Sequence, residues 1–228
     1  ISTYNGLRST SGDGNRTLWN TSISYPLMGS YWFITPKITY SLTHYNDIKH
    51  ARAEIDKSST RSLPIYSLDT GLIFERNSTV FGRETEQTLE PRLFYAYIPY
   101  RNQRHMPNFD SSSADLNFAE LFTPNKYTGF DRIANTNQLS AVLTTRYIDS
   151  GTGKEWFSAT VGQRYYFTDE KVDLYWSNPG KTKNRSDVLA ASQFSLFEGW
   201  RLEGAIQYST EWSRISKTSA GIRYNPRD

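Results

Sequence analysis

Three histidines are the side chains of this 228-residue chain best able to exchange a proton near neutral pH. A hydrolase would need one of them beside a nucleophile and an acid at one point of the fold. His44 ends an alternating apolar stretch, where an interfacial aromatic is the simpler interpretation, and His50 and His105 lie in long polar segments. The sequence has no cysteine and no paired-histidine motif for a metal ion. We therefore expect no enzymatic activity, no metal and no cofactor.

The second set of residues able to do chemistry consists of charged side chains on one parity of alternating stretches. Arginine pairs bidentately with phosphate and carboxylate groups. The cations of this set can therefore contact phosphates and acidic sugars, or they can pair with acids on their own face, and both interpretations stay open. The candidate contact residues are Lys37, Glu90, Arg92, Arg146, Arg164 and Arg223, and the acids available to the cations are Asp69, Glu75, Glu90 and Glu203.

The elements that must position these side chains are stretches in which apolar and polar residues alternate. In "WRLEGAIQYSTEW" (200–212), one parity is Leu, Gly, Ile, Tyr, Thr, Trp and the other is Arg, Glu, Ala, Gln, Ser, Glu. This period of two predicts strands with one apolar face. Most stretches are closer to the roughly 9–11 residues of a tilted transmembrane strand than to the roughly 5–6 of a globular one. Nine strands are predicted, near 17–27, 32–44, 63–76, 87–100, 138–149, 156–168, 187–197, 200–212 and 217–226.

Composition and connections favour a membrane barrel. The 16 Tyr, 12 Phe and 6 Trp suit the aromatic girdles of such barrels, whereas a net charge of +3 with dispersed Lys and Arg does not predict a nucleic-acid partner. Short links alternate with long polar loops near 46–62, 101–137 and 169–186, as in barrels with periplasmic turns. The apolar parity carries no charge in any central span, and a Lys or Arg at the bilayer midplane costs about 2–4 kcal/mol. Pro36 and Pro91, inside strands, predict local bulges.

Several motifs resemble the barrel of one known family, the LptD lipopolysaccharide-assembly proteins of the outer membrane. They are "LEPR", "YIPYRNQ", "PNFDSS", "ELF", "YTGFDRIANTNQ" and "VGQRYYFTD", and the similarity runs from about 24–27 to 204–210. The resemblance implies non-enzymatic transport of lipopolysaccharide into the outer leaflet of a Gram-negative outer membrane. It also implies contacts with outer-membrane lipids, an LptE-type lipoprotein inside the barrel, a periplasmic transport bridge and, during folding, the barrel-assembly machinery.

The chain differs from the full family pattern. We expect residues 1–228 to be one central segment of a large antiparallel transmembrane β-barrel, with nine or ten strands and without the periplasmic N-terminal domain, the family's cysteines or the gate strands. Two alternatives remain open, a free-standing outer-membrane diffusion pore and a soluble all-β glycan-binding domain.

The 101–137 loop is long but rich in aromatic and aliphatic residues, which need something to pack on. We therefore expect it to fold inward over the barrel lumen and to touch the lipoprotein there. The candidate residues are Phe118 and Phe122 for this contact, and Asp131, Arg132, Asn137 and Gln138 for anchoring the return of the loop.

Overall fold

The strands of the computed structural model form one antiparallel sheet. The structure describes residues 2–9, 12–49, 53–80, 82–174, 183–197 and 199–225. The order is β1-β2-β4-β5-β7-β8-β9-β10-β11-β12, with β3 beside β4 and β6 beside β7. The strands are β1 Ser2–Ser9, β2 Gly12–Ser24, β3 Leu27–Met28, β4 Trp32–Lys49, β5 Ser59–Leu72, β6 Phe74–Val80, β7 Arg83–Ile98, β8 Thr136–Asp149, β9 Glu155–Tyr166, β10 Val188–Phe197, β11 Trp200–Ser209 and β12 Arg214–Tyr224.

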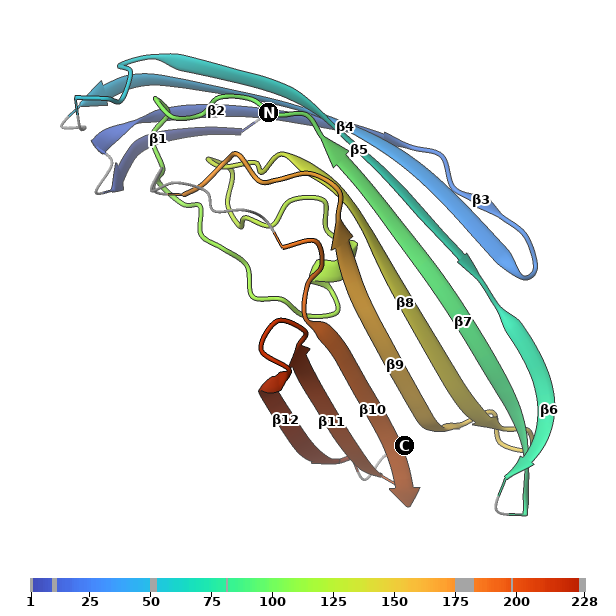
Figure 1. Ribbon diagram of the computed structural model, residues 1–228. Helices are drawn as coiled ribbons and strands as arrows, with labels where there is room; N and C mark the ends of the chain where they lie inside the picture. The colour runs from blue at the N-terminus through green and yellow to red at the C-terminus, as the bar shows by residue number, and fades with distance from the viewer. Residues whose placement is uncertain are drawn as a thin grey trace.

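The sheet is strongly curved, and its long loops gather on the concave side (Figure 1). This arrangement confirms the predicted all-β antiparallel class, and each of the nine predicted strands is present among the twelve strands of the sheet. The sequence pattern does not predict β1, because alternation breaks there at a register shift between Tyr4 and Leu7 and at Gly6, which has a φ of 66°. Among the described residues no helix is long and apolar enough to cross a membrane.

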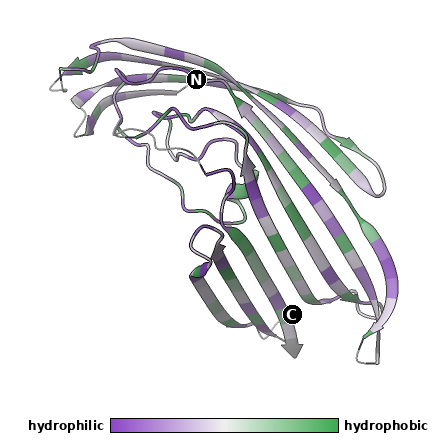
Figure 2. Ribbon diagram, viewed as in Figure 1, coloured by the Kyte–Doolittle hydropathy of each residue, from purple (hydrophilic) through white to green (hydrophobic). Residues whose placement is uncertain are grey.

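Cross-strand register keeps the two parities of the strands on opposite faces. Ile38 of β4, for example, lies between Ile23 of β2 and Tyr66 of β5, and Tyr66 pairs in turn with Tyr97 of β7. All four side chains are exposed on the convex face, by 40% to 75% of their surface. Because side chains alternate along a strand, a slip of one residue would reverse this assignment. Apolar and polar positions accordingly follow one another along the ribbons in Figure 2.

Aromatic side chains mark two levels on the convex face. On four strand paths an aromatic residue near the short-turn end is followed, eight positions along the strand, by one near the long-loop end. At the usual rise of about 3.4 Å per residue, the two levels are about 27 Å apart along the strand. The pairs are Trp32 and Tyr40, Tyr66 and Phe74, Phe157 and Tyr165, and Trp200 and Tyr208.

The prediction of bulges at the two strand prolines is wrong. Pro36 pairs with Leu68 of β5, and Pro91 pairs with Leu143 of β8, in both cases without a register shift. Each proline instead lies where the strand on its other side is interrupted. Beside Pro36 the partner changes from β2 to β3, and beside Pro91 it changes from β5 to β6. Each missing N–H removes one ladder hydrogen bond at this change of partner, and beside Pro36 the Tyr25 N–H still donates to the Pro36 carbonyl at 3.1 Å.

The buried core lies between the concave face and the loop that connects β7 to β8, hereafter the 99–135 loop. Each of the four apolar clusters joins a side chain of this loop to the sheet or to the next long loop. The clusters centre on Tyr45, Ile48 and Met106; on Leu63, Ile98 and Ile133; on Leu121, Val142 and Leu189; and on Tyr127, Ala134 and Val172.

Candidate functional site

The 99–135 loop covers the concave side of the sheet (Figure 1). It contains one short 3₁₀ helix, η1 (Glu120–Phe122), and otherwise consists of turns and extended segments. Two groups of contacts hold it there. One is a set of buried polar side chains near the long-loop ends of β2, β4 and β5, and the other is an apolar contact halfway down β8, β9 and β10.

Asp131 is the centre of the polar set and is fully buried. Its Oδ1 accepts hydrogen bonds from Arg16 Nη1 and Tyr45 Oη, both at 2.7 Å. Its Oδ2 accepts the backbone N–H groups of Phe109 at 2.6 Å and Asp110 at 2.9 Å. One carboxylate thus ties two strands to two separate parts of the loop, residues 109–110 and residue 131. We call Arg16, Tyr45, Arg61 and Asp131 the polar anchor.

Arg61 completes the polar anchor from β5. Its Nη1 donates to Gln103 Oε1 at 2.8 Å and to the Asp131 carbonyl at 2.7 Å. Its Nη2 donates to Thr43 Oγ1 at 3.0 Å and to the Phe130 carbonyl at 2.8 Å. Neutral acceptors therefore satisfy four directions of this buried guanidinium, in agreement with the rule that buried charges are hydrogen-bonded.

Electrostatics within the loop follow the same pattern of burial and pairing. Burial alone would raise the pKa of Asp110, but hydrogen bonds from Arg16 and from the Phe130 N–H outweigh it and lower the pKa. Burial lowers the pKa of Arg132, whose guanidinium donates to the carbonyls of Pro107 and Met106, both at 2.8 Å. Burial, with Glu170 nearby, raises the pKa of Tyr127. The shifts of Asp110 and Tyr127 favour an ionised carboxylate and a neutral phenol at neutral pH.

The second attachment is Leu121 of η1, which is fully buried against Val142 of β8 and Leu189 of β10. Gly162 of β9 makes room for it, because a Cβ there would lie only 2.7 Å from Leu121 Cδ1. Arg164, two residues along β9, donates to the carbonyls of Glu120 and Thr123. A guanidinium from the sheet thus binds the carbonyl of the first η1 residue and that of the residue after η1.

Phe122 lies on the charged part of the concave face. The guanidinium carbon of Arg92 is 3.8 Å from the centre of the Phe122 ring, a cation–π distance. Arg92 also binds Asp69 bidentately, with Nε–Oδ1 at 2.8 Å and Nη2–Oδ2 at 2.5 Å. Phe94 meets the same ring edge-on, with centroids 6.1 Å apart.

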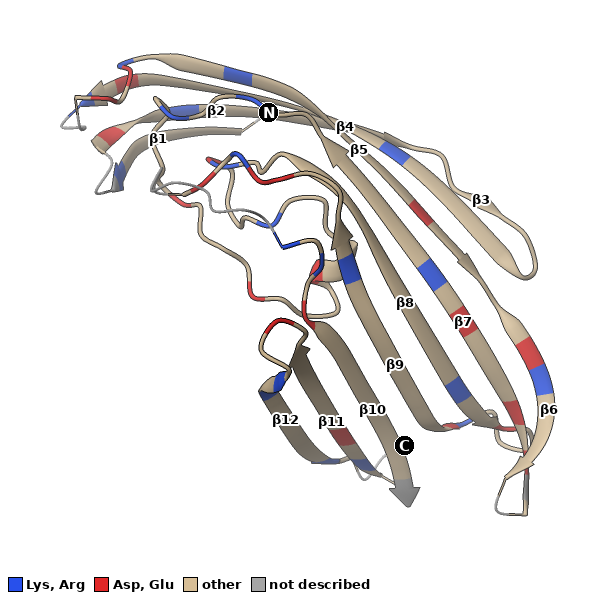
Figure 3. Ribbon diagram, viewed as in Figure 1, with Lys and Arg blue, Asp and Glu red and all other residues tan. Residues whose placement is uncertain are grey.

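The remaining predicted cations lie apart from the loop (Figure 3). Arg146 bridges Glu90 at 3.0 Å and Glu155 at 2.8 Å, so its charge is neutralised within the sheet. Arg223 approaches Glu203 at 3.9 Å. Lys37 is exposed on the concave face and forms no ion pair with any described residue. Of the cations proposed to contact phosphate, Lys37 is thus the one left free in the part of the chain that the structure describes.

The structure brings some of the other predicted residues together and separates the rest. Gln138 Nε2 donates to the Thr123 carbonyl at 3.2 Å, next to the Leu121 contact. Phe118 is partly buried against the same cluster. Asn137 instead accepts from Tyr95 Oη at 2.9 Å on the neighbouring strand. Asn137 therefore joins β8 to β7 rather than to the loop.

The histidines do not assemble a catalytic set in the described residues. His44 Nδ1 lies 2.8 Å from Thr60 Oγ1, and His105 Nδ1 lies 2.7 Å from the Glu54 carbonyl. His50 falls outside the described residues. No group of three His, Cys, Asp or Glu side chains able to hold a metal ion occurs within the described ranges.

Sequence reasoning missed the sheet half of the polar anchor. Arg16, Tyr45 and Arg61 lie one or two residues beyond the predicted strand ends at 17, 44 and 63. Extending the alternation outward places all three on the charged parity, so the signal was present in the pattern. Their common partner in the loop was not readable from sequence, because Arg16 and Asp131 are 115 residues apart.

Comparison with known proteins identifies relatives of this chain. A family model described as LPS transport system D, LptD, matches residues 2–228. The LPS-assembly protein LptD of Paraburkholderia xenovorans is 41% identical over 231 residues, covering 98% of this chain and 29% of that protein. The corresponding protein of Burkholderia thailandensis is 40% identical over 228 residues, with the same two coverages, and that of Cupriavidus necator is 38% identical over 218 residues, covering 93% and 27%. The chain thus spans under a third of the length of these relatives.

Proposed function

The chain belongs to the LptD family, and we propose that it forms part of the wall of an outer-membrane barrel that carries lipopolysaccharide to the outer leaflet. The observation that carries the proposal is the two-sided sheet, with an apolar convex face and a charged concave face covered by the 99–135 loop. The transport step is physical rather than enzymatic in this proposal, and lipopolysaccharide and the surrounding membrane lipids are the molecules that the two faces meet.

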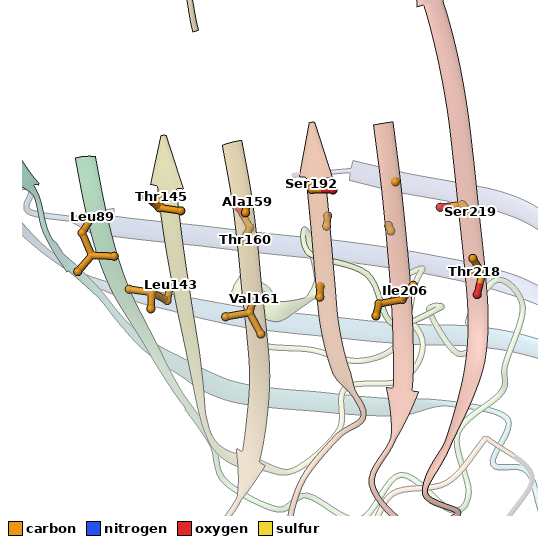
Figure 4. A pocket seen from close by; sticks show the side chains of 14 residues that line it. Leu89, Leu143, Thr145, Ala159, Thr160, Val161, Ser192, Ile206, Thr218 and Ser219 are labelled. Atoms are coloured by element: carbon orange, nitrogen blue, oxygen red, sulfur yellow. The ribbon is translucent and has the colours of Figure 1, made fainter. Parts of the chain in front are cut away.

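The convex face supports placement in a membrane. The two aromatic levels are about 27 Å apart along the strands, so a tilt of about 40° puts them about 20 Å apart along the membrane normal, near the height of a barrel's apolar band. Even the hollow over β7–β12 keeps this character, since its lining holds no charged side chain (Figure 4). An exposed face of this extent does not suit a soluble glycan-binding domain.

The concave face supports a polar passage for sugars. Its arginines are largely neutralised by acids or by carbonyls, so a passing phosphate would have to compete with formed ion pairs. Lys37 forms no such ion pair with a described residue, and it lies between Ser24 and Ser67 of the neighbouring strands. We propose Lys37 as the contact for acidic groups of lipopolysaccharide, with Arg92, Arg146, Arg164 and Arg223 holding the wall.

The loop supports a partner inside the barrel. Phe122 packs on its own wall, whereas the neighbouring Asn117 and Ala119 are exposed on the side away from the sheet contacts. We propose that this exposed side, with Phe118 beneath it, meets an LptE-type lipoprotein. By the same family relation, the full-length protein would receive lipopolysaccharide from a periplasmic bridge and be folded by the barrel-assembly machinery.

Photo-crosslinking in cells tests the proposed function. A crosslinking amino acid at position 37 of the full-length protein should form lipopolysaccharide adducts, and depletion of lipopolysaccharide supply should abolish them. Position 76, which lies on the convex parity beyond the aromatic level, is the matched control and should give none. Absence of adducts at 37, with normal assembly of the protein, would contradict the proposed passage.

A further inference from the structure

Strand β6 (Phe74–Val80) has a free edge although it lies in the middle of the sheet. It pairs with β7 along one side, from Phe74 opposite Leu89 to Val80 opposite Arg83. The strand that would flank its other side ends early, since the turn before β4 closes at Tyr31, whose carbonyl accepts the Ile73 N–H at 2.8 Å. Beyond this point no hydrogen bond from the described residues reaches the other edge of β6. Figure 1 shows this edge unaccompanied.

The free edge has the features of a template for strand addition. It is seven residues long, about 23 Å at 3.3 Å per residue. Its register with β7 is unbroken, and it has no proline and no bulge. Natural sheets usually blunt such edges, because an exposed row of N–H and C=O groups recruits another chain. Phe74 marks the aromatic level on this path, so the rest of the hairpin lies in water if the proposed membrane band is correct.

The charges around the edge specify the chemistry of the occupant. On the concave side of the hairpin, Glu75 of β6 lies on the same face as Glu84 and Glu86 of β7. These three carboxylates form no ion pair with any described side chain. On the opposite face, Arg76 is held by Gln87 Oε1 at 2.7 Å. A second copy of the hairpin would bring carboxylates against carboxylates, which disfavours self-pairing.

We propose that the free edge of β6 accepts an extended segment of a separate polypeptide, with Lys or Arg at alternate positions facing Glu75, Glu84 and Glu86. Backbone hydrogen bonds would supply the attachment, and the alternating charges would select the partner and its register. The proposal rests on the proposed function only for placing the hairpin in water.

A peptide-binding assay on the full-length protein in lipid nanodiscs tests the proposal. The probe is a fluorescent peptide that alternates Lys with Val, and its matched control carries Glu in place of each Lys. The basic peptide should bind about tenfold more tightly, a difference of about 1.4 kcal/mol. The double variant Glu75→Gln/Glu86→Gln should remove most of this preference, while a matched change on the same strand, Thr79→Ser, should leave it unchanged.

Geometry is tested by a disulfide, since the 228 residues contain no cysteine. Asn77→Cys should crosslink to a peptide cysteine at one position only, because an added strand has a fixed register. Normal heat-modifiable mobility of each variant in gel electrophoresis confirms a folded barrel. Equal binding of the two peptides, crosslinking without positional preference, or an internal crosslink from residue 77 to another part of the full-length chain would each overturn the proposal. None of these readouts involves lipopolysaccharide, so their failure leaves the transport proposal standing.

Discussion

The convex and concave faces of this sheet are made by the same strands, yet they solve opposite problems. Toward the outside, the side chains are apolar, and even a hydroxyl such as Thr145 Oγ1 is turned back to donate to the Thr88 carbonyl at 2.8 Å. Toward the inside, charged side chains are abundant, and the deepest of them, Arg16 and Arg61, are buried by the sequence-distant 99–135 loop. The difference teaches that the strand pattern determines the outer surface, whereas the inner surface depends on long-range contacts.

The largest expected effect is on the inner face. Asp131→Ala leaves Arg16 and Tyr45 without their acceptor and frees two backbone N–H groups, and breaking one partner of a buried ion pair costs about 3–5 kcal/mol. We expect residues 103–133 to lose protection in hydrogen exchange of the full-length protein. Asp115→Ala, at a fully exposed loop carboxylate, is the control and should change protection little. Unchanged protection in Asp131→Ala would show that the polar anchor does not hold the loop.

The next effect compares two adjacent positions on β11 that point to opposite faces. Ile206→Arg, if near the midplane, should lower the free energy of unfolding of the assembled barrel by about 2–4 kcal/mol, whereas Gln207→Arg should be nearly neutral. Chemical denaturation in lipid vesicles measures both. Equal tolerance would remove the distinction between the faces on this strand.

A smaller effect concerns the fit of Leu121 over Gly162. Gly162→Ala should destabilise the loop contact by about 1–3 kcal/mol, because the new methyl overlaps Leu121 Cδ1. Leu121→Val in the same chain should recover part of the loss by giving up a methylene. Thermal unfolding of the three variants measures the coupling, and strict additivity would mean that the two side chains do not meet.

The smallest effect is a pH dependence of the loop. The pKa of Asp110 is lowered in the folded state, so its contribution to stability is complete above its unfolded value of about 3.9 and is lost as the pH falls through the folded value. The protection of amides near residue 110, measured as the intrinsic exchange rate at each pH divided by the observed rate, should therefore fall in acid. Asp110→Asn should weaken that dependence, and an identical acid profile in the variant would exclude Asp110 as a cause.

The sequence predicted the sheet well because alternation is a local property of each strand. It failed where a neighbour decides the outcome. The break at Ile73 between β5 and β6 and the meaning of Pro36 and Pro91 depend on which strand lies alongside. Arg61 could not be assigned from sequence either, since its acceptors at Phe130 and Asp131 are about 70 residues away in the chain. The prediction that the loop meets a partner stays a prediction.

The most direct test of the two-sided wall is a nitroxide scan of β11 from residue 202 to residue 208 in the full-length protein in lipid vesicles. Spin labels at even positions should be relaxed mainly by oxygen, which partitions into lipid, and labels at odd positions mainly by a water-soluble nickel complex. The two profiles should alternate with a period of two and be out of phase. Accessibility to the nickel complex at both parities would contradict the placement of this sheet between lipid and an aqueous lumen.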